Sequence, residues 1–134
     1  MAKSLEAQLR EIAERRTGDI EDIASASMLR MGNRIIQGSP VDDGRFINNW
    51  MSAFNGIDYS TSRPENKAGT DSTAGLESKT SKVELNVDFY FTNSLPYAKR
   101  LEYEGWSAQA SKGMVRINAL HWDKIVQQEV NKRK

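Results

Sequence analysis

The sequence predicts an α+β fold in which a long N-terminal helix and a C-terminal helix pack on a small, mainly antiparallel sheet. The prediction rests on three stretches of the sequence. Apolar residues recur at helical spacing over residues 3–37 and 118–132, and they alternate strictly with polar residues over residues 82–92. A chain of 134 residues with 38 % hydrophobic side chains can bury one core, so we expect a single domain over residues 1–134.

The first helix, residues 3–37, is predicted by apolar residues at steps of three and four. Gly18 interrupts it, and because glycine costs about 1 kcal/mol in a helix interior, we expect one helix with a local flaw there. Gly38, Ser39 and Pro40 end it. The stripe comprises Leu5, Leu9, Ile12, Ala13, Arg16, Ile20, Ile23, Ser27, Met31 and Ile35.

The segment after this helix, "SPVDDGRFINNW" and beyond, predicts a turn and then a strand. Asp42 or Asp43 can cap a short turn, and Gly44 can relieve the backbone there. Aromatic residues then recur at a spacing that fits helix and strand equally. We expect a short helical turn that passes into a strand around residues 50–54.

Residues 55–81 are dominated by Ser, Thr, Gly, Asn and Asp. The segment is too polar to bury itself and too long for an ordinary connection. We therefore expect a flexible polar loop, or an arm that becomes ordered against a neighbouring molecule.

The strand at residues 82–92, "KVELNVDFYFT", is the clearest element in the sequence. Apolar side chains alternate with polar ones, which predicts one face on the core and one on water. Tyr90 on the polar side is an exception. The inward set is Val83, Leu85, Val87, Phe89 and Phe91.

The C-terminal third predicts a short helix, a short strand and a closing helix. Ser94 is a candidate N-cap with Pro96 in the first turn, and Gly105 ends that helix. The stretch "GMVRI", residues 113–117, resembles a strand, and residues 118–132 form the last helix. The terminal "NKRK" is interpreted as a frayed, solvated helix end rather than a phosphate contact.

Composition excludes several classes of protein. The net charge of +1 does not favour a nucleic-acid binder, and the absence of cysteine excludes disulfides and thiolate metal sites. The sequence contains neither a signal-peptide pattern nor an apolar run long enough to span a membrane. We expect a protein that acts in the cytoplasm, or in an assembly built there, without a cofactor or membrane partner.

Candidate catalytic groups are few. His121 is the only histidine, so a metal site would need carboxylates alone, and a surface or half-buried helix histidine is the favoured interpretation. The neighbouring acids Asp42 and Asp43, and Glu102 with Glu104, do not share a helix face. The "GSPVDDG" stretch lacks the lysine of a phosphate-binding loop. We therefore expect no enzyme and no catalytic, cofactor-binding or metal-binding residue.

Three aromatic residues lie close together in the stretch "LPYAKRLEYEGWSAQASKGMV". Tyr97, Tyr103 and Trp106 could stack on bases or sugars, but single-strand binders interleave basic residues with such aromatics. At this spacing, aromatics are more often core residues or anchors of a protein interface.

Two sequence blocks carry a family resemblance: "SPVDDGRFINNW", residues 39–50, and "NSLPYAKRLEYEGWSAQASKGMVR", residues 93–116. Together they resemble the small tail-completion or neck proteins of long-tailed bacteriophages, a group that includes minor tail proteins similar to protein Z of phage lambda. The resemblance extends over the whole chain in the order and spacing of its elements. Asp43 and Ser111 depart from the threonine and proline usual in the family.

The resemblance implies a structural virion protein at the head–tail junction, assembled in the host cytoplasm. It implies a homo-oligomer, expected to be a six-fold ring, that joins the tail to the head-side connector and lines the DNA passage. The implied partners are a tail-terminator or tail-tube protein and a head-completion protein, with DNA nearby in the channel. A tail-terminator ring is the closest alternative, and a small hydrolase using Glu102 or Asp42, or a nucleic-acid binder, belongs to other classes.

On this interpretation the second block forms a structural corner at the subunit interface. We expect residues 96–106 to pack under the long helix of their own subunit and residues 55–81 to reach a neighbouring ring or the tail tube. The candidate structural or interface residues are Pro40, Asp42, Gly44, Arg45, Trp50, Pro96, Tyr97, Leu101, Glu102, Tyr103, Gly105, Trp106, Gln109, Gly113 and Met114.

Overall fold

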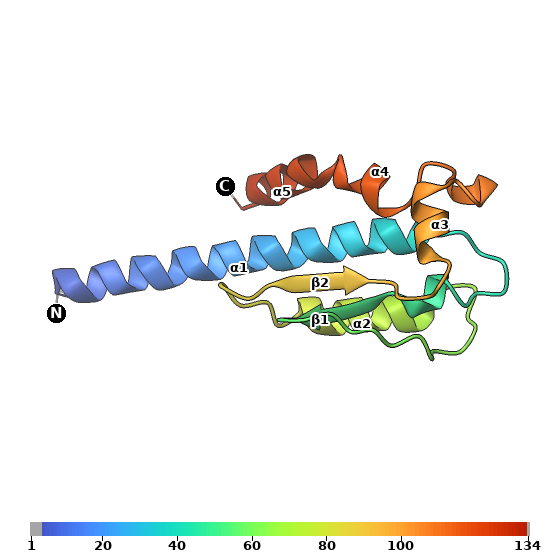
Figure 1. Ribbon diagram of the computed structural model, residues 1–134. Helices are drawn as coiled ribbons and strands as arrows, with labels where there is room; N and C mark the ends of the chain where they lie inside the picture. The colour runs from blue at the N-terminus through green and yellow to red at the C-terminus, as the bar shows by residue number, and fades with distance from the viewer. Residues whose placement is uncertain (1–3, 134) are drawn as a thin grey trace.

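The structure, a computed structural model, describes residues 4–133 and confirms the α+β class. A long helix, α1 (Leu5–Gln37), lies between two layers (Figure 1). On one side lie the strands β1 (Met51–Phe54) and β2 (Phe89–Thr92) with helix α2 (Thr70–Thr80). On the other side lie α4 (Val115–Ala119) and α5 (Trp122–Asn131), while α3 (Ala98–Tyr103) stands at the end of α1 where that helix stops.

Helix α1 runs without a break through Gly18, so the prediction of one long helix is confirmed. The Ser4 side chain caps its start by accepting a hydrogen bond from the backbone N–H of Ala7 at 3.1 Å. At its end, the N–H of Gly38 donates to the carbonyl of Arg34 at 2.9 Å. The helix therefore acts as one straight element that the rest of the chain covers only in part.

The two halves of the α1 apolar stripe have different surroundings. In the C-terminal half, Ile35 and Ile36 are buried in the core. In the N-terminal half, Leu5, Leu9 and Ile12 are exposed to 71 %, 57 % and 44 %. Figure 1 shows why, because this half projects beyond the body of the molecule.

The sheet has two strands, and it is shorter than the sequence predicts. Met51 pairs with Thr92 and Phe54 with Phe89 in an antiparallel register. The predicted strand at 82–92 is therefore wrong for residues 82–88. Asn86 has a positive φ of 66°, which interrupts an extended chain, and the four residues of β1 offer no partner further back.

Helix α2 lies within the segment predicted as a polar loop, so that prediction is wrong for residues 70–80. Leu76 is fully buried against Gly32 of α1, and a Cβ at Gly32 would overlap its side chain. The buried polar residues have partners: the Thr80 hydroxyl donates to the carbonyl of Leu76 at 2.8 Å, and the Ser72 hydroxyl accepts from the N–H of Trp50 at 3.0 Å. A Ser- and Thr-rich helix can therefore form a wall of the core.

The C-terminal elements also differ from the prediction. Residues 113–117 are not a strand, because α4 begins at Val115. The predicted helix at 118–132 is interrupted between α4 and α5 at Leu120 and His121, both of which are exposed. The short helix predicted after Ser94 is present as α3, although it begins at Ala98 rather than directly after Ser94.

Candidate functional site

The two sequence blocks, residues 39–50 and 93–116, lie against each other, and we call their joint surface the corner. The side-chain amide of Gln109 pairs with the backbone of Val41 twice: it accepts from the N–H at 2.9 Å and donates to the carbonyl at 3.0 Å. The Asn93 amide donates to the carbonyl of Phe46 at 2.9 Å. Segments about 50 to 70 positions apart in the sequence thus form one structural unit.

A row of aromatic rings fills the inside of the corner. Trp50 stacks on Phe91 with ring centroids 5.1 Å apart and planes within 8°. Phe46 meets Trp50 edge-on at 5.6 Å and lies 6.0 Å from Tyr97. The indole N–H of Trp50 donates to the Ser39 hydroxyl at 2.9 Å, so this buried ring also has its polar partner.

The Ser39 hydroxyl extends this connection to α1. It donates to the carbonyl of Ile35 at 2.8 Å while accepting from Trp50, so it links the last turn of α1 to the aromatic row. Pro40 follows as a buried residue. The predicted helix stop at residues 38–40 therefore also anchors the first block.

Glu102 is the best-connected polar residue of the corner. Its carboxylate accepts hydrogen bonds from the backbone N–H groups of Met114 at 3.0 Å, Val115 at 2.7 Å and Arg116 at 3.2 Å. The Arg116 guanidinium adds an ion pair at 3.1 Å and a hydrogen bond to the Glu102 carbonyl. Burial raises the pKa of Glu102, but these hydrogen bonds outweigh it and hold the pKa below its ordinary value.

This arrangement explains why residues 115–117 begin a helix and do not form a strand. The carboxylate satisfies N–H groups at the start of α4, which an extended strand would present differently. Gly113 has a φ of 86°, and a Cβ there would overlap the Glu102 side chain. Met114 is then buried in the core. The Glu102 carboxylate therefore caps the start of α4, and both of its oxygens are used in these hydrogen bonds.

A pocket of about 350 Å³ lies on the outside of the corner. Tyr97 is half-buried at this pocket, and burial raises the pKa of its hydroxyl. Asp43 stabilises the turn, because its carboxylate accepts a hydrogen bond from the backbone N–H of Arg45 at 2.9 Å. Residues of both blocks line the pocket, among them Pro40, Asp42, Arg45, Leu101, Trp106 and Gln109.

Two predicted aromatics stay on the surface. Tyr103 and Trp106 are 63 % and 59 % exposed. Each is covered by a guanidinium: Arg116 lies 4.6 Å from the Tyr103 ring centroid, and Arg100 lies 5.0 Å from that of Trp106. Each ring therefore has a guanidinium on one side and is otherwise open to solvent.

The remaining predicted residues have structural positions. Gly44 adopts a φ of 91° directly against the backbone of Asn66 and Lys67. Gly105 follows α3 with a φ of 60°, Leu101 is buried in the core, and Pro96 is exposed. The structure thus brings most of the predicted set together, while Gly44 belongs to a contact with the loop.

The sequence interpretation missed the polar residues that hold residues 63–71 on the body. The fully buried Asn48 amide donates to the carbonyl of Pro64 at 2.8 Å and to the carboxylate of Asp71 at 2.9 Å. The Arg63 guanidinium donates to the carbonyl of Trp50 at 2.8 Å. The predicted arm is therefore wrong for this part of the loop. The two asparagines directly before Trp50, Asn48 and Asn49, are the sequence feature that could have indicated these contacts.

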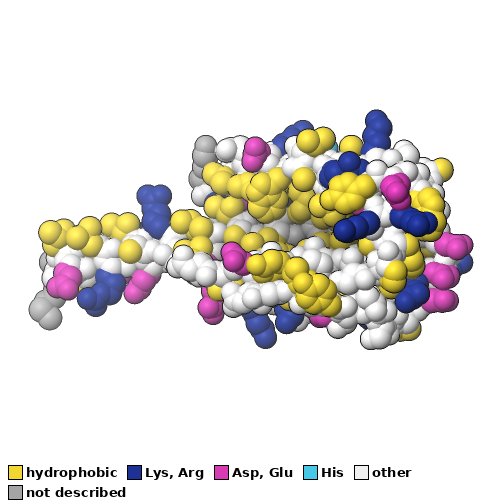
Figure 2. Space-filling model, viewed as in Figure 1, with side chains coloured by type: hydrophobic (Ala, Val, Ile, Leu, Met, Phe, Trp, Pro, Cys, Tyr) yellow, Lys and Arg dark blue, Asp and Glu magenta, His cyan; other side chains and the backbone are white. Residues whose placement is uncertain are grey.

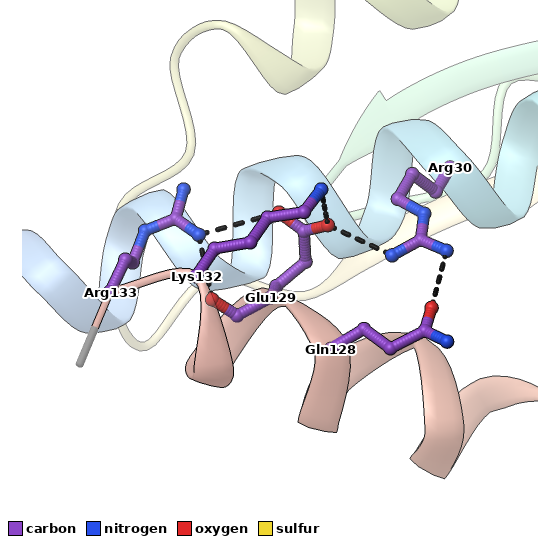
Figure 3. Close-up of polar contacts among 5 residues, drawn as sticks. All are labelled: Arg30, Gln128, Glu129, Lys132 and Arg133. Atoms are coloured by element: carbon purple, nitrogen blue, oxygen red, sulfur yellow. Dashed lines mark hydrogen bonds and ion pairs between the residues drawn. The ribbon is translucent and has the colours of Figure 1, made fainter.

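A second missed cluster joins α5 to α1 (Figure 3). The buried Glu129 carboxylate binds Arg30 and Lys132, each at 2.9 Å, and Arg133 at 3.3 Å. The hydrogen bond from Lys132 is the largest cause that lowers the pKa of Glu129 to about 2, with those from Arg30 and Arg133 acting in the same direction against burial. The predicted solvated helix end is confirmed in that residues 131–133 are exposed, but it is wrong that this end is frayed, because Lys132 and Arg133 pair with Glu129. Lys134 lies outside the described residues.

Residues 4–133 contain no group of three or more potential metal ligands of the His, Cys, Asp and Glu types. Within the same range, none of the helices has the length and apolar character to cross a membrane. Comparison of the chain with protein-family models, curated proteins and solved structures finds no match.

Proposed function

We propose that the chain is a structural subunit of the head–tail junction of a long-tailed bacteriophage, where copies form a ring that joins the tail to the head-side connector. The observation that carries the proposal is the corner. The two blocks that resemble neck proteins contact each other directly through Gln109 and Val41. Side chains of these blocks pack in the core, as Trp50 and Leu101 do, or line the surface pocket, as Trp106 does.

The chemistry of the corner supports a structural role over a hydrolase. Glu102, the acid that such an enzyme would use, is engaged by three backbone N–H groups and Arg116, with its pKa lowered rather than raised. A general acid at neutral pH requires a raised pKa. His121 is exposed at the break between α4 and α5, as a surface residue would be.

The distribution of surfaces also suits a ring. The corner lies at one end of α1, and the exposed apolar stripe lies at the other (Figures 1 and 2). In a ring, one surface of each copy meets a different surface of the next, so two unlike surfaces are needed. The net charge of +1 agrees with proximity to DNA in a channel rather than with tight binding.

Genetic complementation tests the proposal. A phage that lacks this gene should produce filled heads and complete but unattached tails, and the chain supplied in trans should restore joined particles. Electron microscopy of the lysates distinguishes this result from tails of irregular length, which a tail terminator would give. Normal particles without the gene would contradict both.

A matched pair of variants connects the assembly to the corner. Trp106→Ala removes an exposed anchor, so it should leave folding intact and lower the yield of joined particles at least tenfold. Tyr59→Ala removes an aromatic of similar exposure outside the corner, 71 % exposed, and should leave the yield unchanged. Equal yields for the two variants would contradict a role of the corner in assembly.

A further inference from the structure

The strongest unexplained feature is the apolar stripe on the projecting part of α1. Leu5, Leu9 and Ile12 follow each other at steps of four and three, which places them on one helix face. Soluble proteins scatter single apolar residues over the surface, but an ordered stripe on one helix face marks a contact. Figure 2 shows hydrophobic side chains along one edge of this projection.

The body of the same copy lies too far along α1 to cover this stripe. Leu5 precedes Met28 by 23 positions on one unbroken helix, which corresponds to about 35 Å at 1.5 Å per residue. The stripe and the body are therefore held apart by the helix that carries both. Among residues 4–133, no part of the same copy that lies in the body reaches the stripe.

A second apolar surface lies on the body. A groove of about 380 Å³ runs between α1, the chain leading into β2 and the start of α5. Its lining is apolar except for Asp88 at the edge. The lining residues are Met28, Met31, Gly32, Ile35, Val87, Phe89, Phe91 and Trp122.

The lengths of the two surfaces agree. The stripe from Leu5 to Ile12 and the groove floor from Met28 to Ile35 each extend over seven helical positions, or about 10 Å. Two turns of one helix can thus lie along two turns of another.

The charges are also complementary. Residues 4–22 hold six acidic and three basic side chains, a net charge of −3. Where the end of α5 meets α1, Arg30 of α1 and Lys132 and Arg133 at the end of α5 surround the single carboxylate Glu129, a net charge of +2. An acidic helix that approaches this side of the body is attracted, with Asp88 as the one opposing charge in the groove lining.

We propose that the Leu5–Ile12 stripe of one copy docks in the groove between α1, β2 and α5 of a second copy. This inference deepens the proposed function and rests on its claim that copies assemble. The contact is heterologous, so each copy donates a stripe at one end and receives one in the body, as a ring requires. Two helical turns bury less surface than the about 800 Å² per partner of a stable interface. We therefore expect an isolated pair to dissociate and a closed ring, in which every copy makes two such contacts, to be stable.

Disulfide trapping tests this contact, because the sequence has no cysteine of its own. Leu9→Cys mixed with Val87→Cys should form a disulfide-linked dimer of the two different variants under mild oxidation. Arg10→Cys, on the charged and exposed side of the same helix turn, is the matched control and should link at least tenfold more slowly with Val87→Cys. Equal rates for the two pairs would overturn the inference.

Sedimentation velocity over a concentration series gives a second, independent measurement. The unaltered chain should associate with rising concentration, and the double variant Leu9→Ser/Ile12→Ser should weaken association at least tenfold with an unchanged circular dichroism spectrum. If association persists unchanged in the double variant, the groove contact is wrong while a ring through other surfaces stands. If the double variant behaves normally in solution but fails to enter virions, the stripe binds a different virion protein and the inference is again wrong.

Discussion

The two halves of α1 belong to one helix and carry one apolar stripe, yet only the C-terminal half packs into the hydrophobic core. Ile35 of the stripe and its neighbour Ile36, in the C-terminal half, are buried between the layers, whereas Ile12, in the N-terminal half, is 44 % exposed. The pattern that predicts a helix therefore says which face is apolar but not whether the same chain covers it. Side chains in the two halves should contribute very differently to stability and to assembly.

The largest expected effect comes from truncating the same side chain in both halves. Ile36→Ala should lower the free energy of unfolding by about 3 kcal/mol, because it leaves a cavity in the packed core. Ile12→Ala should change it by less than about 0.5 kcal/mol, since its side chain is already in water. Urea unfolding measures both, and equal losses would mean that the projecting half is covered within the monomer.

A somewhat smaller loss of stability should follow from removing the ion pairs between α5 and the C-terminal half of α1. Glu129→Gln should cost about 2 kcal/mol, because the carboxylate accepts charged hydrogen bonds from Arg30, Lys132 and Arg133. Glu6→Gln in the projecting half is the control, since its ion pair with Arg10 is exposed. Thermal unfolding at pH 7 compares the two variants, and a comparable loss for both would contradict a specific role of the cluster.

The same carboxylate should make stability depend on acid. The pKa of Glu129 is about 2 in the folded chain and 4.5 ordinarily, so its contribution is present above pH 4.5 and is lost as the pH falls towards 2. The difference in unfolding free energy between the unaltered chain and Glu129→Gln should therefore shrink across this window. A difference that stays constant from pH 5 to pH 2.5 would contradict the lowered pKa.

Two glycines of α1 should respond to alanine with opposite signs. Gly32→Ala should cost about 1 kcal/mol, because overlap with the buried Leu76 side chain exceeds the gain in helix propensity. Gly18→Ala should stabilise by about 0.7 kcal/mol, since a Cβ there meets no neighbouring atom within 4 Å. Destabilisation by Gly18→Ala would show that the projection has a packing partner.

Sequence reasoning located the elements whose signals are local. The unbroken α1, a strand around residues 50–54 and the short helix ended by Gly105 follow from spacing and breakers. For the corner, the sequence predicts a structural unit in residues 96–106, but not that the two blocks contact each other. Its internal contacts, such as Gln109 with Val41, depend on positions far apart in the chain.

The errors have a shared physical cause. Helix α2 was missed because Ser72 and Thr80 resemble loop residues until Trp50 and the helix backbone satisfy their hydroxyls. Helix α4 was taken for a strand because its cap, Glu102, lies more than ten positions earlier in the chain. In both places a long-range hydrogen bond outweighs the local preference of the sequence.

The unbroken α1 is also a mechanical lever. Its projecting part extends about 27 Å at 1.5 Å per residue from Ser4 to Asp22, and it passes Gly18 without a hinge. A rotation of about 10° where α1 enters the body would therefore move the tip by about 5 Å, close to one helical turn. Packing between α1, α2 and α5 thus sets how accurately the tip is aimed, so a core substitution far from Leu5 can misdirect it without altering the tip itself.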